Sequence, residues 1–266
     1  MPLVSTLVII LFVSEEILRR LDQIEDEENV SIVYACESGS RAWGFESTDS
    51  DWDVRFIYVH QQDWYLSIDV EDKGDVIERP INDELDISGW DLRKALKLLR
   101  KSNPPLLEWL SSPIIYKETG KTAPNLRRAV TEFYSPISAF HHYLHMAQGN
   151  NREFLKGDLV RVKKYFYVLR PLLAIRWIEN DSTQPVPMEF QKLVDGCVDC
   201  PDVRSAIDDL LTRKRAGREL DREPQINVLS DFIDAELSRL EKLTVPEREK
   251  PDFEKLNEIF RAAIRT

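Results

Sequence analysis

Hydrophobic and polar residues follow two different periods along this chain, and the change between them divides it into two halves. In the first half, segments with a period of two are interleaved with short helical segments, which is typical of a sheet with helices packed on it. From residue 135 onward, apolar residues recur at spacings of three and four, which predicts helices. The pattern therefore predicts an α/β (α+β) half followed by a helical C-terminal half.

The first half contains three segments with strand character and three with helix character. The β-branched and alternating stretches predict strands at 30–36, 51–60 and 85–88. Apolar residues at helical spacing predict helices at 15–24 and 91–101, the second capped by Asp91. A further short helix is expected at 106–111, after the break at Asn103-Pro104-Pro105.

The second half reads as a succession of helices. They are predicted near 136–148, 156–178, 188–196, 202–214, 226–243 and 252–264. Ser135-Pro136 suits the start of the first, and Pro171 is expected to kink the second. The transition falls near residues 116–133, so we predict a catalytic domain over 1–120 and a helical domain over 121–266.

The apolar segment 3–13 is too short to span a bilayer and lacks the basic residues and cleavage site of a secretory signal. It is interpreted as a buried strand, as the start of the first helix, or as an extension from an upstream start codon. We therefore expect a cytoplasmic protein with no membrane partner. Three cysteines are too few for a disulfide framework, which agrees with a reducing compartment.

The net charge limits the function classes further. The chain of 266 residues carries a formal charge of −11, so it repels nucleic acid at long range. This counts against a processive polymerase. It is compatible with an enzyme that acts on a nucleotide and a small or end-bound acceptor through a local basic patch.

The stretch with the clearest chemistry pairs a glycine-serine turn with two aspartates. Asp51 and Asp53 lie two apart on a predicted strand, so both side chains leave the same face. Neighbouring carboxylates repel each other, and divalent cations between them offset this repulsion. Short acidic side chains are typical ligands of Mg²⁺ in two-metal sites.

The turn ten residues earlier has features of a phosphate-binding loop. Gly39 permits close approach of the backbone to a phosphate, and Ser40 can donate to a phosphate oxygen. Arg41 would add a charge-assisted contact. Phosphates would then meet the loop while metals meet the strand, which suits nucleotidyl transfer with pyrophosphate leaving.

A third carboxylate would strengthen the site, and Asp86 is the best candidate. It lies between Leu85 and Ile87 on a short strand, so it should point away from the core side, toward a cleft. Asp91 is the alternative, although its place at a helix start favours a capping role. The competing interpretation of Asp51 and Asp53 is an acidic pair on an exposed edge strand.

These residues resemble the polymerase β nucleotidyltransferase superfamily, and more narrowly its RNA repair pathway polymerase β family. The resemblance covers about residues 20–180. It rests on Gly39-Ser40-Arg41-Ala42-Trp43-Gly44-Phe45, Asp49-Ser50-Asp51-Trp52-Asp53-Val54-Arg55, Asp86, the segment 103–110 and the segment 163–171.

The resemblance implies a small mixed β-sheet catalytic domain followed by a helical domain, with two Mg²⁺ ions and a nucleoside triphosphate as substrate (EC 2.7.7 type). Asp51 and Asp53 would hold both ions, while Asp86 would hold one and help to deprotonate the acceptor. Some members of the family are associated with RNA ligases, which suggests an RNA end as acceptor and a ligase as partner. The expected triphosphate-binding residues are Gly39, Ser40, Arg41, Ser50, Lys163 and Arg170.

Basic residues are concentrated between 152 and 178, where seven stand against two acidic ones. Lys156, Lys163 and Arg170 recur every seven residues, which would place them with Tyr167 on one helical face for a triphosphate or an RNA end. A solvated helix face explains the pattern equally well. A second cluster at 213–215 is interpreted as a solvated helix end.

Two other functions agree with the same motifs. One is nucleotidylation of a protein or of a small molecule, which the acidic surface favours weakly. The other is a weakly catalytic antitoxin or partner-binding module with the same fold, against which the intact carboxylates argue. The identity of the triphosphate and of the acceptor and the oligomeric state do not follow from the sequence.

Overall fold

The computed structural model describes residues 2–47, 49–81, 85–217, 222–241 and 252–265, with only the backbone for residues 2–11. Its centre is a five-stranded sheet in the order β3-β4-β2-β1-β5. All neighbouring strands are antiparallel except β2 and β4, which are parallel, so the sheet is mixed as predicted. The strands are β1 (Val30–Ser38), β2 (Trp52–His60), β3 (Val76–Glu78), β4 (Leu85–Asp91) and β5 (Ile115–Glu118).

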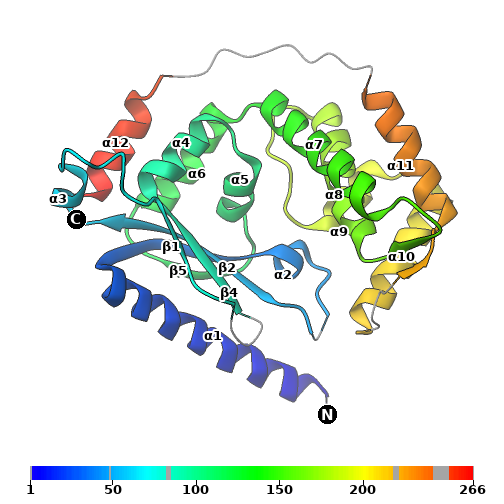
Figure 1. Ribbon diagram of the computed structural model, residues 1–266, viewed down its shortest axis with the longest axis horizontal. Helices are drawn as coiled ribbons and strands as arrows, with labels where there is room; N and C mark the ends of the chain where they lie inside the picture. The colour runs from blue at the N-terminus through cyan, green and yellow to red at the C-terminus, as the bar shows by residue number, and fades with distance from the viewer. Residues whose placement is uncertain (1, 48, 82–84, 218–221, 242–251, 266) are drawn as a thin grey trace.

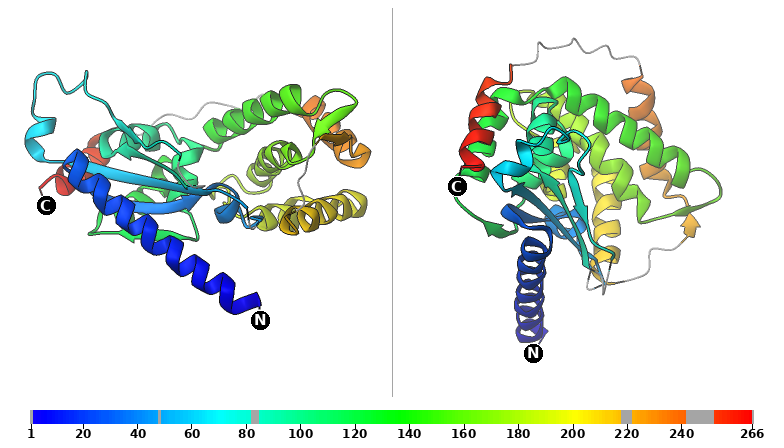
Figure 2. Two further views of the ribbon diagram at one scale, coloured as in Figure 1. Left: turned by 60° about the horizontal axis from the view of Figure 1, so that its bottom comes forward. Right: turned by 60° about the vertical axis from the view of Figure 1, so that its left-hand side comes forward.

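Helices cover both faces of this sheet (Figure 1). One face packs on α1 (Pro2–Glu28), whose Ile17, Leu21 and Ile24 are buried. The other face packs on α4 (Leu92–Arg100), α5 (Pro104–Leu110) and α6 (Thr122–Phe133). The apolar segment 3–13 is therefore the start of the first helix, and Figure 2 shows this end of α1 extending beyond the sheet.

The alternation along β2 decides which side chains face which layer. Val54, Phe56 and Tyr58 are buried toward α1, whereas Ile57 and Val59 belong to the core on the opposite face. Since side chains alternate along a strand, the odd-numbered residues of β2 point away from α1. Both polar residues considered below, at positions 53 and 55, are odd-numbered.

The helical half lies beside the end of the sheet where β1 ends and β2 begins (Figure 1). It consists of α7 (Pro136–Phe154), α8 (Lys164–Asn180), α9 (Phe190–Cys197), α10 (Pro201–Arg215) and α11 (Asn227–Leu240), with a two-stranded ribbon of β6 (Leu159–Arg161) and β7 (Arg222–Pro224). The last helix, α12 (Glu254–Ala263), returns to pack on α4 and α6. The division at residue 120 stays a prediction. Two short helices, α2 (Gly39–Trp43) and α3 (Gln62–Tyr65), complete the described elements.

Two local expectations need correction. The predicted helix 156–178 is interrupted, because Gly157 has a φ of +108°, β6 follows, and α8 begins only at Lys164. Lys156 therefore does not share a helical face with Lys163, and it forms an ion pair with Asp234 instead. The helix α6 was not predicted, since it falls in the segment interpreted as a transition.

Asp91 caps α4 as expected, because its carboxylate accepts from the backbone N–H of Arg93 at 2.7 Å. No helix in the described ranges is long and apolar enough to cross a membrane.

Candidate active site

A cavity of about 350 Å³ lies where the sheet meets the helical half. One wall comes from the end of β1, from α2 and from the start of β2, and the other comes from α8 and α10. The residues that line it are Ser38, Gly39, Ser40, Trp43, Phe45, Asp49, Ser50, Asp51, Asp53, Arg55, Lys163, Phe166, Tyr167 and Lys214. The glycine-serine turn and both motif aspartates therefore share one cavity.

The turn at Gly39 brings the backbone of α2 against the carboxylate of Asp53. Gly39 has a φ of +69°, a conformation that favours glycine. A Cβ atom on Gly39 would lie 2.0 Å from Oδ2 of Asp53. Glycine is thus required at this position for two reasons: the backbone conformation and the close approach of the Asp53 carboxylate.

The backbone of Asp53 is held by the carboxyl group of Glu37. The backbone N–H of Asp53 donates to Oε1 of Glu37 at 2.9 Å, and Glu37 is fully buried. The hydroxyl of Tyr116 donates to the other oxygen of Glu37. Burial raises the pKa of Glu37 to about 7, although the hydrogen bonds from Tyr116 and from the backbone of Asp53 oppose this rise. The sequence reasoning missed Glu37, since it lies within an otherwise apolar strand.

Asp86 and Asp53 are register partners on the parallel strands β4 and β2, so their side chains leave the same face. Arg55 lies between them. Its Nη2 is 2.7 Å from Oδ2 of Asp86 and 3.3 Å from Oδ1 of Asp53. Asp86 was expected to point toward a cleft, but its carboxylate is engaged by an arginine and does not line this cavity.

The remaining donor set determines which residues fit a divalent cation. Across the described ranges, no group of three or more His, Cys, Asp or Glu side chains is arranged to hold a metal ion. Burial raises the pKa of Asp53, and the neighbouring charges of Asp86 and Asp51 add to this effect, whereas Arg55 opposes it. A cation beside Asp51 and Asp53 would relieve this cost, so these two carboxylates fit a hard divalent ion.

The segment between α2 and β2 is held in place by its own side chains. Arg41 donates to the backbone carbonyls of Ser50 at 2.6 Å and Asp51 at 3.2 Å, and its guanidinium stacks 3.7 Å from the ring centre of Trp52. Arg41 therefore braces the loop that carries Asp51 and does not line the cavity. Ser50 does line it, and its hydroxyl lies 3.1 Å from that of Ser47.

The helical wall contributes two lysines and an aromatic pair. Lys163 lies at the start of α8 and lines the cavity, and Lys214 reaches from α10 to the hydroxyl of Ser47 at 2.7 Å. Burial lowers the pKa of Lys214, as does the charge of Lys163. Tyr167 packs edge-on against Trp43, with ring centres 5.9 Å apart. Lys214 was assigned to a solvated helix end from the sequence, and this interpretation is wrong.

Arg170 does not meet the cavity, contrary to the prediction that it contacts a triphosphate. It is 2% exposed, its Nη1 lies 2.9 Å from a carboxylate oxygen of Glu108, and its Nη2 donates to the carbonyl of Met188. Its guanidinium also lies 4.6 Å from the ring centre of Trp43. Arg170 therefore supports the wall of the cavity from inside the core.

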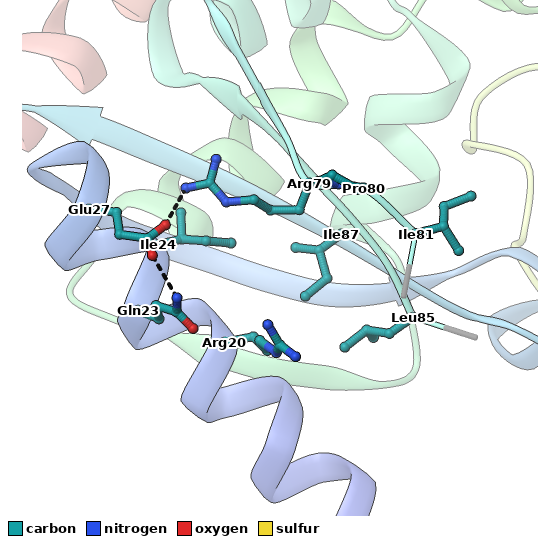
Figure 3. A pocket seen from close by; sticks show the side chains of 9 residues that line it. All are labelled: Arg20, Gln23, Ile24, Glu27, Arg79, Pro80, Ile81, Leu85 and Ile87. Atoms are coloured by element: carbon teal, nitrogen blue, oxygen red, sulfur yellow. Dashed lines mark hydrogen bonds and ion pairs between the residues drawn. The ribbon is translucent and has the colours of Figure 1, made fainter. Parts of the chain in front are cut away.

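A second cavity, of about 400 Å³, lies between α1 and the β3–β4 hairpin (Figure 3). Aliphatic side chains such as Ile24 and Ile87 line it, and Arg79 at its edge is paired with Glu27 and Glu28. Among its described residues, the charged side chains Arg20 and Arg79 are both engaged in ion pairs with glutamates.

Three comparisons relate this chain to known proteins. The sequence profile of the RNA repair pathway DNA polymerase beta family matches residues 13–262. A Bacillus subtilis (strain 168) protein described as uncharacterized protein YcgL is 53% identical over 226 residues, which is 85% of this chain and 86% of that protein. A crystal structure of a nucleotidyltransferase-like protein from Exiguobacterium sibiricum 255-15 aligns over 91% of this chain and 87% of that chain, with 15% identity and a TM-score of 0.31.

Proposed function

Because the chain belongs to the RNA repair pathway DNA polymerase beta family, we propose that it transfers a nucleoside monophosphate from a nucleoside triphosphate to a hydroxyl or phosphate acceptor. One observation carries this proposal: Asp51 and Asp53 face Lys163 and Lys214 across a single cavity. Carboxylates on one wall suit a metal ion, and ammonium groups on the other suit the phosphates that the ion does not neutralise.

The two walls have separate tasks in this reaction. Asp51 and Asp53 hold Mg²⁺, which when bound supplies positive charge for the reacting phosphate and its leaving group. Gly39 leaves room for the Asp53 carboxylate, and the hydroxyl of Ser40 faces the phosphates. Lys163 and Lys214 bind the triphosphate tail.

The aromatic pair on the helical wall is placed to receive the base. Tyr167 and Trp43 both line the cavity and fix each other through an edge-on contact. A base can stack on such rings with little dependence on its identity. Lys164 lies over the ring of Tyr167, 4.4 Å from its centre, which adds positive charge beside this pair.

The acceptor is an RNA end, with an RNA ligase as the partner that uses the product. Arg161 and Arg222 stand opposite each other on the β6–β7 ribbon, where they line a separate cavity with Lys156 and Glu153, and Lys164 follows at the start of α8. Like charges opposite each other on a ribbon are unfavourable unless an anion lies between them. In a chain of charge −11, this group supports an anionic acceptor.

The test is incubation of the purified protein with each labelled nucleoside triphosphate and Mg²⁺, with and without RNA that carries a free 3′-hydroxyl or a 5′-phosphate. We expect RNA-dependent incorporation of label, and loss of at least about 100-fold in Asp51→Asn and Asp53→Asn, because supporting residues alone typically account for 10–100-fold. Asp231→Asn, an exposed change on α11, is the matched control. Absence of product from the wild type with every triphosphate and acceptor would contradict the proposal.

A further inference from the structure

Arg55 forms ion pairs with two of the three carboxylates, Asp53 and Asp86, and the proposed reaction leaves it without a task. It lies two residues after Asp53 on β2, so it occupies the same face of the sheet. Its side chain is only 18% exposed. A charge buried to this extent needs partners that stay in place.

Those partners hold both ends of the guanidinium. Nη1 donates to the backbone carbonyls of Val54 and Asp86, each at 3.0 Å. Nη2 contacts the carboxylates of Asp86 at 2.7 Å and Asp53 at 3.3 Å. The two carbonyls belong to the strands themselves, so Arg55 is fixed by the sheet and not only by the carboxylates.

The position of Arg55 decides what Asp86 can bind. A metal ion on Asp86 would have to displace a guanidinium that has four contacts, or bind beside it. The guanidinium keeps its proton and its positive charge at any accessible pH, so it would repel the ion. Through its two ion pairs, Arg55 already compensates part of the negative charge of Asp86 and Asp53.

We propose that Arg55 takes the place of a second metal ion at Asp86, so that the free protein binds a single divalent cation through Asp51 and Asp53. Asp86 is then a positioning residue that holds Arg55, and not a metal ligand. This inference rests on the proposed function in one respect, since it takes Asp51 and Asp53 as the metal ligands.

The test counts bound ions and does not require turnover. Electron paramagnetic resonance of Mn²⁺ titrated into the free protein gives the number of saturable sites. We expect one site in the wild type and in Arg55→Lys, which keeps the positive charge. Arg55→Met frees Asp86 and should bind two ions, and the double variant Arg55→Met/Asp86→Asn should return to one. Two sites or none in the wild type, or one site in folded Arg55→Met, would overturn the proposal.

Two controls keep the outcome decisive. If Arg55→Met does not fold, judged by its circular dichroism, the comparison is between the wild type and Asp86→Asn. One site in each supports the proposal, whereas two in the wild type and one in Asp86→Asn overturn it. A protein that binds one Mn²⁺ but transfers no nucleotide refutes the proposed function alone, and one that binds two and transfers normally refutes this inference alone.

Discussion

Replacement of Gly39 by alanine separates the two reasons for glycine at this turn. The first reason is conformational: at a φ of +69°, alanine costs about 1–2 kcal/mol of folding free energy. The second is steric, because the new Cβ would lie 2.0 Å from Oδ2 of Asp53. Real Cβ atoms essentially never approach a neighbour within 3.0 Å, so the Asp53 carboxylate has to withdraw by at least 1.0 Å, the difference between the two distances.

A 1 Å displacement of the Asp53 carboxylate should change the folding free energy little but reduce the rate of transfer strongly. A misplacement of about 1 Å at a reacting centre can cost on the order of 100-fold in rate. We therefore expect Gly39→Ala to unfold at lower urea, with a loss of about 1–2 kcal/mol, and to transfer nucleotide about 100-fold more slowly. Its Mn²⁺ affinity should fall with its rate, since Asp53 is a proposed ligand.

Gly120→Ala is the matched control for the conformational part. Gly120 has a φ of +63°, and a Cβ there would meet nothing within 4 Å. It lies between β5 and α6, outside the cavity lining. Urea unfolding should show a similar stability loss in both variants, whereas only Gly39→Ala should lose activity. Equal transfer rates for the two variants would refute the argument that Gly39 exists to admit Asp53.

Three further outcomes follow from individual contacts. Lys214→Met should raise the KM for triphosphate by about 10- to 100-fold with a smaller change in kcat, as expected for one lost charged hydrogen bond; steady-state kinetics that show an unchanged KM would remove Lys214 from the binding wall. Arg170→Met should destabilise by about 3–5 kcal/mol in urea, because Glu108 loses its buried partner; a raised KM without destabilisation would restore the phosphate role. Burial raises the pKa of Glu236, but hydrogen bonds from Arg176 and Arg239 outweigh it and lower the pKa to about 2. The stabilisation that these ion pairs give above pH 4.5 should therefore be lost as the pH falls toward 2. The urea midpoint of the wild type should fall over this range, and that of Glu236→Gln should not.

The sheet half of the site followed from sequence because its geometry is local. Alternation along β2 places Asp53 on a defined face, and the pattern Leu85-Asp86-Ile87 places Asp86 on the same one, as the parallel register shows. The same alternation places Arg55 on the face of Asp53, but its ion pair with Asp86 was not predicted. Residues two positions apart on a strand are neighbours on the same face, so the contact between Arg55 and Asp53 could have been predicted from the sequence.

The helical wall did not follow from sequence, because its contacts join distant segments. Lys214 meets Ser47 across 167 positions, and nothing local to 213–215 distinguishes it from an ordinary solvated helix end. Arg170 failed for the opposite reason. Helical spacing predicted that it shares a face with Lys163, but spacing does not show that Glu108 of α5 lies beside it in the core.

The contacts between α10 and the loop before β2 link the two walls of the cavity mechanically. Lys214 binds the hydroxyl of Ser47, and Arg215 donates to the carbonyl of Gly44 at 3.0 Å. The same loop carries Asp51, and Arg41 braces it from the other side. The position of a proposed metal ligand therefore depends on a helix far along the chain. Without the helical half, the carboxylates would lack Lys163 and Lys214, and the site would attract a triphosphate less strongly. The charge balance of the proposed site is thus a property of the folded junction between the halves, and changes at the end of α10 should affect metal and triphosphate binding together.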